Sequence, residues 1–188
     1  MKNEYELYTS QARPVLDALT RDGVCYSKEE YVQKKYGEIA PIFLTAYGWY
    51  VRQAQAIVPR PEGASYPYWA FADRYSVDDS SGGSILRLRV PRGEAVFFDV
   101  QDWNKILKLS YIGETPAEER AFADELAARG LHSSQVMLTN FYPELKARIL
   151  ESWKRLFRRH AAIQNGDASE VSSIQAGLWC IKKEWIVM

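Results

Sequence analysis

The spacing of apolar residues changes along the chain, and this change restricts the fold more than any other feature of the sequence. In residues 85–90 apolar side chains alternate with Arg87 and Arg89, as in a half-buried strand. In residues 39–57 they recur every three or four positions, as along one face of a helix. Because the two periods occupy separate segments, the sequence predicts an α+β fold.

The first thirty-five residues contain several shorter elements. Residues 5–10 and 24–26 are β-prone, and Pro14 opens an apolar-periodic run between them that stops at Gly23. Proline near the start of a helix and glycine after its last turn predict the order strand, helix, strand. Residues 27–35 are predicted to form a further helix, with a serine at the capping position.

An aromatic segment, YPYWAF, follows the long helix. Pro67 cannot donate to a β-ladder, so this strand should begin there or lie at a sheet edge. Alternation predicts Tyr66 and Tyr68 on one face and Trp69 and Phe71 on the other. Such rings either pack in the core or stack on a flat ligand such as a base or a nicotinamide ring.

Capping residues define the helices of the second half. Asp99 and Asp102 have the spacing of an N-cap and a first-turn acid. Thr115 and Glu118 form a capping box with proline between them, which predicts a helix that ends near residue 130. An apolar stripe at four-residue spacing in residues 145–156 predicts the last helix.

Residues 174–187 read as a terminal strand pair or one long strand. Gln175 and Trp179 are predicted on one face of it, with Gln175 inside an otherwise apolar stretch. A buried amide must find hydrogen bonds. Gln175 therefore either ties down neighbouring backbone or presents a donor and an acceptor to a ligand in a cleft.

The composition favours one domain over residues 1–188, since the apolar fraction of 47% can bury one core. The 24 basic and 24 acidic residues balance, so binding to nucleic acid requires a local patch. Cys25 and Cys180 are far apart in apolar runs, which favours buried, reduced thiols. With no signal-peptide pattern and no span long enough for a bilayer, we expect a cytoplasmic protein without a membrane partner.

Common catalytic motifs are missing from the sequence. It contains no Gly-x-Ser-x-Gly, P-loop or Gly-x-Gly-x-x-Gly pattern. The motifs typical of hydrolases with a catalytic triad, Walker ATPases and Rossmann dehydrogenases are therefore missing. The two histidines, His132 and His160, have no Cys/His group at short spacing. We therefore expect no metal site.

A cluster of basic residues lies near the end of the last predicted helix: Lys154, Arg155, Arg158, Arg159 and His160. Such a cluster can hold a phosphate backbone. Cations are also favoured at a helix C-terminus because they oppose the helix dipole. The sequence leaves both interpretations open.

Several short motifs, in this order, resemble a bacterial family known as domain of unknown function 3841. The resemblance covers nearly the whole chain, with Tyr8 at a position where that family is expected to have tryptophan. The motifs that carry it are Leu7-Tyr8-Thr9-Ser10-Gln11, Tyr66-Pro67-Tyr68-Trp69-Ala70, Leu88-Arg89-Val90-Pro91 leading to Asp99 and Trp103, Glu151-Ser152-Trp153, and Ile174-Gln175-Ala176 followed by Trp179.

A looser resemblance links the opening strand, helix, Gly23 and second strand to compact ADP-ribosyltransferase-like domains. It implies a split, mostly antiparallel sheet flanked by helices, and NAD as cofactor. It also implies that the first strand holds the nicotinamide end, a middle strand supplies an aromatic or hydroxyl group, and a later strand supplies a glutamate. The positions that take these roles here are Tyr8 and Thr9, Tyr66 or Trp69, and Gln175, with Trp179 on the same predicted face as Gln175.

Two departures from that pattern concern the chemistry. The first strand lacks the usual histidine or arginine, and Gln175 cannot carry the charge that stabilises an oxocarbenium-like transition state. Glu184 is the next carboxylate downstream of Gln175. The resemblance therefore implies either an active transferase or a nucleotide-binding domain that has lost the reaction.

We thus expect an NAD- or nucleotide-binding, ADP-ribosyltransferase-like protein that modifies a macromolecule in a toxin or phage-defence setting. Its catalytic residues would be Tyr8 and Gln175, and its cofactor-binding residues would be Thr9, Tyr66, Trp69 and Trp179. The alternatives are a non-catalytic module that reads nucleic acid through the basic cluster and the aromatic strand, and a regulatory protein that binds a protein partner through an exposed apolar patch.

Overall fold

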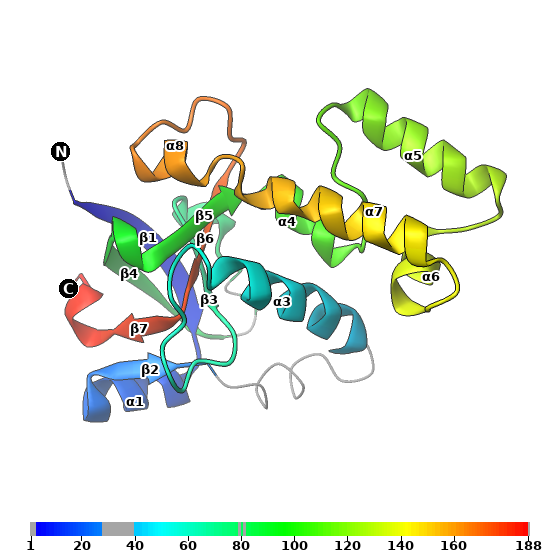
Figure 1. Ribbon diagram of the computed structural model, residues 1–188. Coiled ribbons are helices and arrows are strands. Elements are labelled where there is room, and N and C mark those ends of the chain that lie inside the picture. The colour runs from blue at the N-terminus through cyan, green and yellow to red at the C-terminus, as the bar shows by residue number, and fades with distance from the viewer. Residues whose placement is uncertain (1–2, 28–39, 79, 81, 188) are drawn as a thin grey trace.

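The computed structural model describes residues 3–27, 40–78, 80 and 82–187. It contains a five-stranded sheet in the order β4-β1-β3-β6-β5 and a two-stranded sheet of β2 and β7, and all neighbouring strands are antiparallel (Figure 1). The predicted α+β class with a split, antiparallel sheet is therefore confirmed. The strands are β1 (Glu4–Gln11), β2 (Val24–Tyr26), β3 (Tyr68–Phe71), β4 (Ser84–Pro91), β5 (Ala95–Asp99), β6 (Ile174–Leu178) and β7 (Cys180–Lys182).

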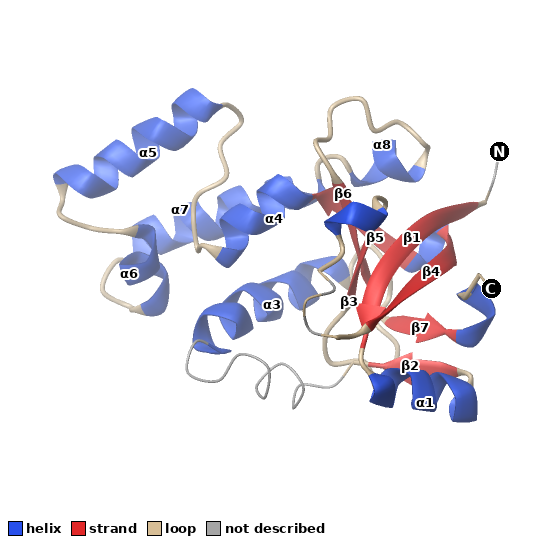
Figure 2. Ribbon diagram, turned by 180° about the vertical axis from the view of Figure 1, so that it is seen from behind, coloured by secondary structure: helices blue, strands red, loops and turns tan. Residues whose placement is uncertain are grey.

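The helices are distributed unevenly around the sheets. Figures 1 and 2 show α1 beside the small sheet, α3 and α4 beside the large sheet, and α5, α6 and α7 extending away from it. The helices are α1 (Arg13–Asp22), α3 (Ala40–Ala54), α4 (Val100–Leu107), α5 (Pro116–Ala128), α6 (Ser133–Leu138), α7 (Pro143–Trp153) and α8 (His160–Gln164), with short 3-10 turns η2 (Arg74–Ser76), η3 (Arg92–Glu94), η4 (Lys154–Phe157) and η5 (Lys183–Trp185).

The large sheet separates two apolar cores. On one face, Trp69, Val96 and Phe98 pack against the aromatic residues of α3 and against α4 and α7. On the other face, strand residues such as Leu7 and Phe97 pack with α1, α8 and the small sheet. Successive residues of β5 alternate between these cores, as a strand buried on both faces requires.

Local sequence signals set most element boundaries correctly. Gly23 ends α1 in the left-handed conformation, with φ of 76°. The side chain of Asp99 accepts a hydrogen bond from Gln101 N at the start of α4, and that of Thr115 accepts one from Glu118 N at the start of α5. The helix predicted for residues 27–35 lies outside the described residues except for its capping serine.

Three elements differ from the prediction. Tyr66 packs on the side of Trp69, opposite to Tyr68, because β3 begins only after Pro67 and strand alternation does not extend back to it. Of the two forms predicted for residues 174–187, the structure shows two strands rather than one, but they belong to different sheets and do not pair with each other. The stripe of residues 145–156 continues from α7 into η4, and α8 follows as a further helix.

A close contact fixes the position of α3 on the sheet. A methyl group added at Gly177 would lie 2.1 Å from the hydroxyl oxygen of Tyr50. Tyr50 is 1% exposed and is surrounded by Trp69, Phe98 and Trp103, so its ring has little room to move. Only glycine therefore allows β6 to pass beneath this ring.

Both outer strands of the large sheet are hydrogen-bonded on their outer sides. On β4, the carbonyl of Arg87 accepts a hydrogen bond from Val187 N at 2.9 Å. On β5, Phe97 N donates to Nδ1 of His160 at 3.1 Å. Burial lowers the pKa of His160, so its imidazole stays neutral and Nδ1 remains an acceptor.

We predict that Gly177→Ala lowers the free energy of unfolding by about 1–3 kcal/mol, because the added methyl group overpacks the core at Tyr50. Urea denaturation would measure the loss. Gly93→Ala is the matched control, since nothing lies within 4 Å of a methyl group at that position. Equal midpoints for the two variants would show that the Tyr50 contact is not restrictive.

We also predict that the His160 contact is lost in acid. The pKa of His160 is lowered in the folded state, so the unfolded chain binds more protons below its ordinary value of about 6.5. Stability contributed by neutral His160 is complete above that pH and falls as the pH drops from there through the folded-state pKa. Denaturation at several pH values should show this slope in the wild type and a smaller one in His160→Asn, whose amide oxygen can replace Nδ1 as acceptor.

Candidate functional site

A cavity of about 550 Å³ opens on the face of the large sheet that carries α3 and α4. Its volume is within the range of small-molecule sites in proteins. Strands β1, β3 and β6 contribute the floor, and α3, α4 and the segment after η2 contribute the walls. The lining residues are Thr9, Ser10, Gln11, Ser27, Tyr47, Pro67, Tyr68, Trp69, Phe71, Ser76, Val77, Asp78, Val100, Trp103, Asn104, Leu107 and Gln175.

The strand register aligns three side chains in a row across the sheet. Tyr8 of β1 is the Cα partner of Phe71 in β3, and Phe71 is the Cα partner of Gln175 in β6. Residues that face each other across antiparallel strands project to the same side. Phe71 and Gln175 therefore form one continuous strip of the cavity floor.

Three aromatic residues from different elements form the inner wall. Tyr47 of α3 stacks on Trp103 of α4, with ring centroids 5.8 Å apart, and Trp69 of β3 lies 4.7 Å from Trp103. The Nε1–H group of Trp69 donates to the Tyr47 hydroxyl at 3.1 Å. The indole N–H group of Trp69 is thus satisfied within the wall.

Among the described residues, the lining has polar side chains without a hydrogen-bond partner: Oγ of Ser10, which is fully buried, and the side chains of Gln175 and Trp103. Gln175 is 5% exposed and Trp103 is 3% exposed, and neither makes a side-chain hydrogen bond within the part of the chain that the structure describes. A buried polar group in this condition costs about 1–3 kcal/mol unless water or a ligand satisfies it. Both side chains border the cavity, so a molecule in the cavity can bond to them.

Thr9 has a different role, because its hydroxyl joins two strands. It is 1% exposed, donates to the carbonyl of Trp69 at 2.7 Å and accepts from Nε2 of Gln11 at 2.7 Å. Both hydrogen-bonding functions of the hydroxyl are occupied in this arrangement. Thr9 thus shapes the cavity by holding β1 against β3.

The structure brings only some of the predicted site residues together. Thr9, Trp69 and Gln175 line the cavity. Tyr8 lies beside Phe71 but outside the lining, and its hydroxyl donates to Glu6 at 2.6 Å, which raises the pKa of Tyr8. The other two predicted site residues, Tyr66 and Trp179, also lie outside the lining.

Tyr66 and Trp179 do not line the cavity themselves. The ring of Tyr66 packs edge-on against Tyr47, at 5.7 Å between centroids. Trp179 is 5% exposed, and its Nε1–H group donates to the carbonyl of Val58 at 2.7 Å. Its indole belongs to the core because the chain leaves the large sheet at this residue.

Sequence reasoning did not select three residues that prove central to the cavity: Tyr47, Phe71 and Trp103. Phe71 was recognised as part of the aromatic strand, but its position opposite Gln175 depends on strand pairing between distant segments. Trp103 follows the Asp99 cap, which predicts its helix but not the face that it presents to the sheet. No local signal in the sequence identifies either contact.

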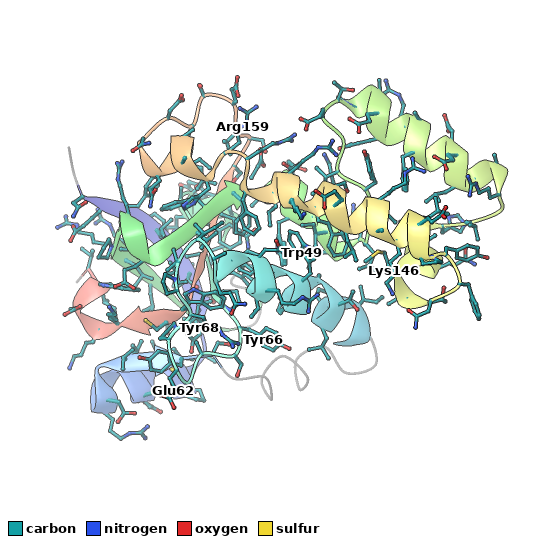
Figure 3. The ribbon with its side chains drawn as sticks, in the orientation of Figure 1. Trp49, Glu62, Tyr66, Tyr68, Lys146 and Arg159 are labelled. Atoms are coloured by element: carbon teal, nitrogen blue, oxygen red, sulfur yellow. The ribbon has the colours of Figure 1, made fainter. Side chains whose placement is uncertain are left out.

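The basic cluster is engaged in ion pairs rather than in the cavity. Arg155 pairs with Glu114 at 2.7 Å, and Arg158 pairs with buried Asp102 at 3.0 Å. These contacts connect η4 to α4 and to the segment before α5. The other ion pairs of the cluster are Lys154 with Glu151 and Arg159 with Glu170, and Figure 3 labels Arg159 near α8.

The charge of the lining limits its chemistry. Among its described residues Asp78 is the only acidic side chain, and no Lys, Arg or His contributes. No group of three or more His, Cys, Asp or Glu residues in the described ranges is arranged to hold a metal ion. The cavity therefore suits a neutral, flat group better than a phosphate.

The fold and the cavity define an α+β domain with a ligand-sized, aromatic and amide-lined site. The chain belongs to the family described as domain of unknown function (DUF3841), which matches residues 6–187. No curated protein and no solved structure matches it. Within the described residues, no helix is long and apolar enough to cross a membrane.

We predict that Thr9→Val lowers the free energy of unfolding by about 1–3 kcal/mol, because it leaves the Trp69 carbonyl and the Gln11 amide without their partner. Chemical denaturation would measure this. Thr9→Ser retains the hydroxyl and should recover most of the stability. If the serine and valine variants were equally destabilised, shape rather than hydrogen bonding would explain the role of Thr9.

Proposed function

We propose that the cavity binds NAD or another nucleotide, with a flat ring of the ligand inserted against Phe71 and Trp69. One observation carries this proposal: the buried, unpartnered amide of Gln175 lies beside Phe71 on the floor of a ligand-sized cavity. Aromatic faces stack on any flat π system, and the amide can bond to the edge of such a ring.

The strand order supports the same proposal. The resemblance to ADP-ribosyltransferase-like domains requires the first strand, a middle aromatic strand and a late strand to meet at one site. Strands β1, β3 and β6 are neighbours in the large sheet, although about 160 residues separate Thr9 from Gln175 in the sequence. Each of the three contributes a residue to the cavity floor.

Transfer of ADP-ribose to a macromolecule, in a toxin or phage-defence setting, is the fuller activity that this resemblance implies. The described lining has fewer residues suited to catalysis of that transfer than to binding of the ligand. Gln175 is uncharged where a glutamate is expected, and Asp78 supplies the carboxylate of the lining from the segment after η2. We therefore propose ligand binding as the primary function and treat NAD cleavage as a separate question for experiment.

The nucleic-acid-binding alternative has weaker support. A phosphate backbone would have to displace the pairs of Arg155 with Glu114 and of Arg158 with Asp102. Asp102 is 5% exposed, so removal of its partner would leave a buried carboxylate uncompensated. A protein-binding surface has other candidates, since Tyr75, Leu138 and Phe141 are exposed.

We predict that NAD raises the melting temperature of the protein saturably, because it binds the folded state alone. Differential scanning fluorimetry and titration calorimetry would measure binding, and release of free nicotinamide would report cleavage. Phe71→Leu should weaken binding at least tenfold by removal of the stacking ring. Phe141→Leu, the same change at an exposed residue remote from the cavity, is the control and should bind as the wild type does. Absence of a saturable response to NAD, ATP and AMP would refute the proposed function.

A further inference from the structure

We infer that Gln175 selects a ligand ring whose edge carries a hydrogen-bond donor next to an acceptor, and that it rejects an edge that carries an anion. This inference rests on the proposed function, and it specifies the chemistry that the cavity recognises. The amide of glutamine offers one acceptor oxygen and two donor hydrogens, so it can form two parallel hydrogen bonds with such an edge.

The surroundings of Gln175 direct its amide toward the cavity. Within the sheet its Cα partners are Phe71 in β3 and Phe98 in β5, and neither side chain can form a hydrogen bond with it. Phe98 is completely buried, which closes the side of β5. A ring stacked on Phe71 therefore has its edge at the amide, because side chains on opposite residues of paired strands are about 5 Å apart at Cβ.

Two other polar groups near Gln175 are already bonded. The Thr9 hydroxyl bonds to the Trp69 carbonyl and to Gln11, and the Trp69 indole bonds to Tyr47. The polar groups left for a ring edge are therefore the amide of Gln175, which alone offers a donor beside an acceptor, and the hydroxyl of Ser10, which is buried and has no partner among the described residues.

An anionic edge is disfavoured for two reasons. A carboxylate has acceptors only, so one of its oxygens would oppose the amide oxygen of Gln175. Its charge would also lose hydration in a cavity whose described lining contains Asp78 and no cation. A site that hydrogen-bonds a polar group of its ligand rejects analogues without that group by a much larger factor than an apolar pocket rejects an analogue that differs by one group.

Two parts of NAD carry the required edge. The nicotinamide ring has a carboxamide, and adenine presents N6 and N7, which glutamine reads in pairs elsewhere. Two analogues distinguish them. Nicotinic acid adenine dinucleotide replaces the carboxamide by a carboxylate, and nicotinamide purine dinucleotide replaces the adenine amino group by hydrogen, so that its edge keeps acceptors but has no donor.

Titration calorimetry of the wild type and of Gln175→Met with NAD and both analogues tests the inference. We expect one analogue to bind the wild type at least tenfold more weakly than NAD, which would identify the inserted ring. We expect the methionine variant, which retains the side-chain volume without hydrogen bonds, to bind that analogue and NAD within about threefold of each other.

Each other outcome contradicts the inference. Similar affinities of the wild type for all three dinucleotides would overturn it and leave the proposed function intact. Discrimination that persists in Gln175→Met would assign the selection to another residue. Failure of all three dinucleotides to bind would overturn both proposals together.

Discussion

The contact between the Tyr50 ring and the backbone of Gly177 sets the spacing between α3 and the large sheet, and the rest of this face depends on that spacing. Tyr47 stands one turn before Tyr50 on α3, so the same contact positions the residue that supports Trp69 and Trp103. Among the described residues the hydroxyl of Tyr50 has no hydrogen-bond partner, and burial raises its pKa well above the ordinary value. At Tyr50 the helix is thus held by close packing, and one turn earlier the hydrogen bond from Trp69 to Tyr47 adds a polar contact.

Much of the fold follows from short-range signals, because capping and alternation act over a few residues. Gly23, Asp99 and Thr115 mark element boundaries that the structure confirms. Such signals could not predict the side of the sheet on which Tyr66 packs or the division of the C-terminal strands between two sheets. Both depend on the residue at which a strand ends, and that residue is set by pairing with neighbouring strands.

The sequence predicts only part of the site, because some of its contacts join segments that are far apart in the chain. The placement of Gln175 in an apolar strand signals a buried amide, and Thr9 and Trp69 lie in motifs that resemble a family pattern. Phe71 becomes relevant only when β3 pairs with β6, and Trp103 only when α4 packs on the sheet. Trp179 shares strand parity with Gln175, yet the chain changes sheets there and its indole enters the core.

The hydrogen bonds on the outer sides of β4 and β5 have a consequence for assembly. A partner peptide or a second copy of the chain often associates with a sheet by adding a strand to a free edge. Here the C-terminal segment occupies the Arg87 carbonyl on one edge, and the imidazole of His160 occupies the Phe97 amide on the other. Strand addition at β4 would therefore have to displace the C-terminal segment, and addition at β5 would have to displace His160, so neither edge offers a free row of backbone groups at these positions.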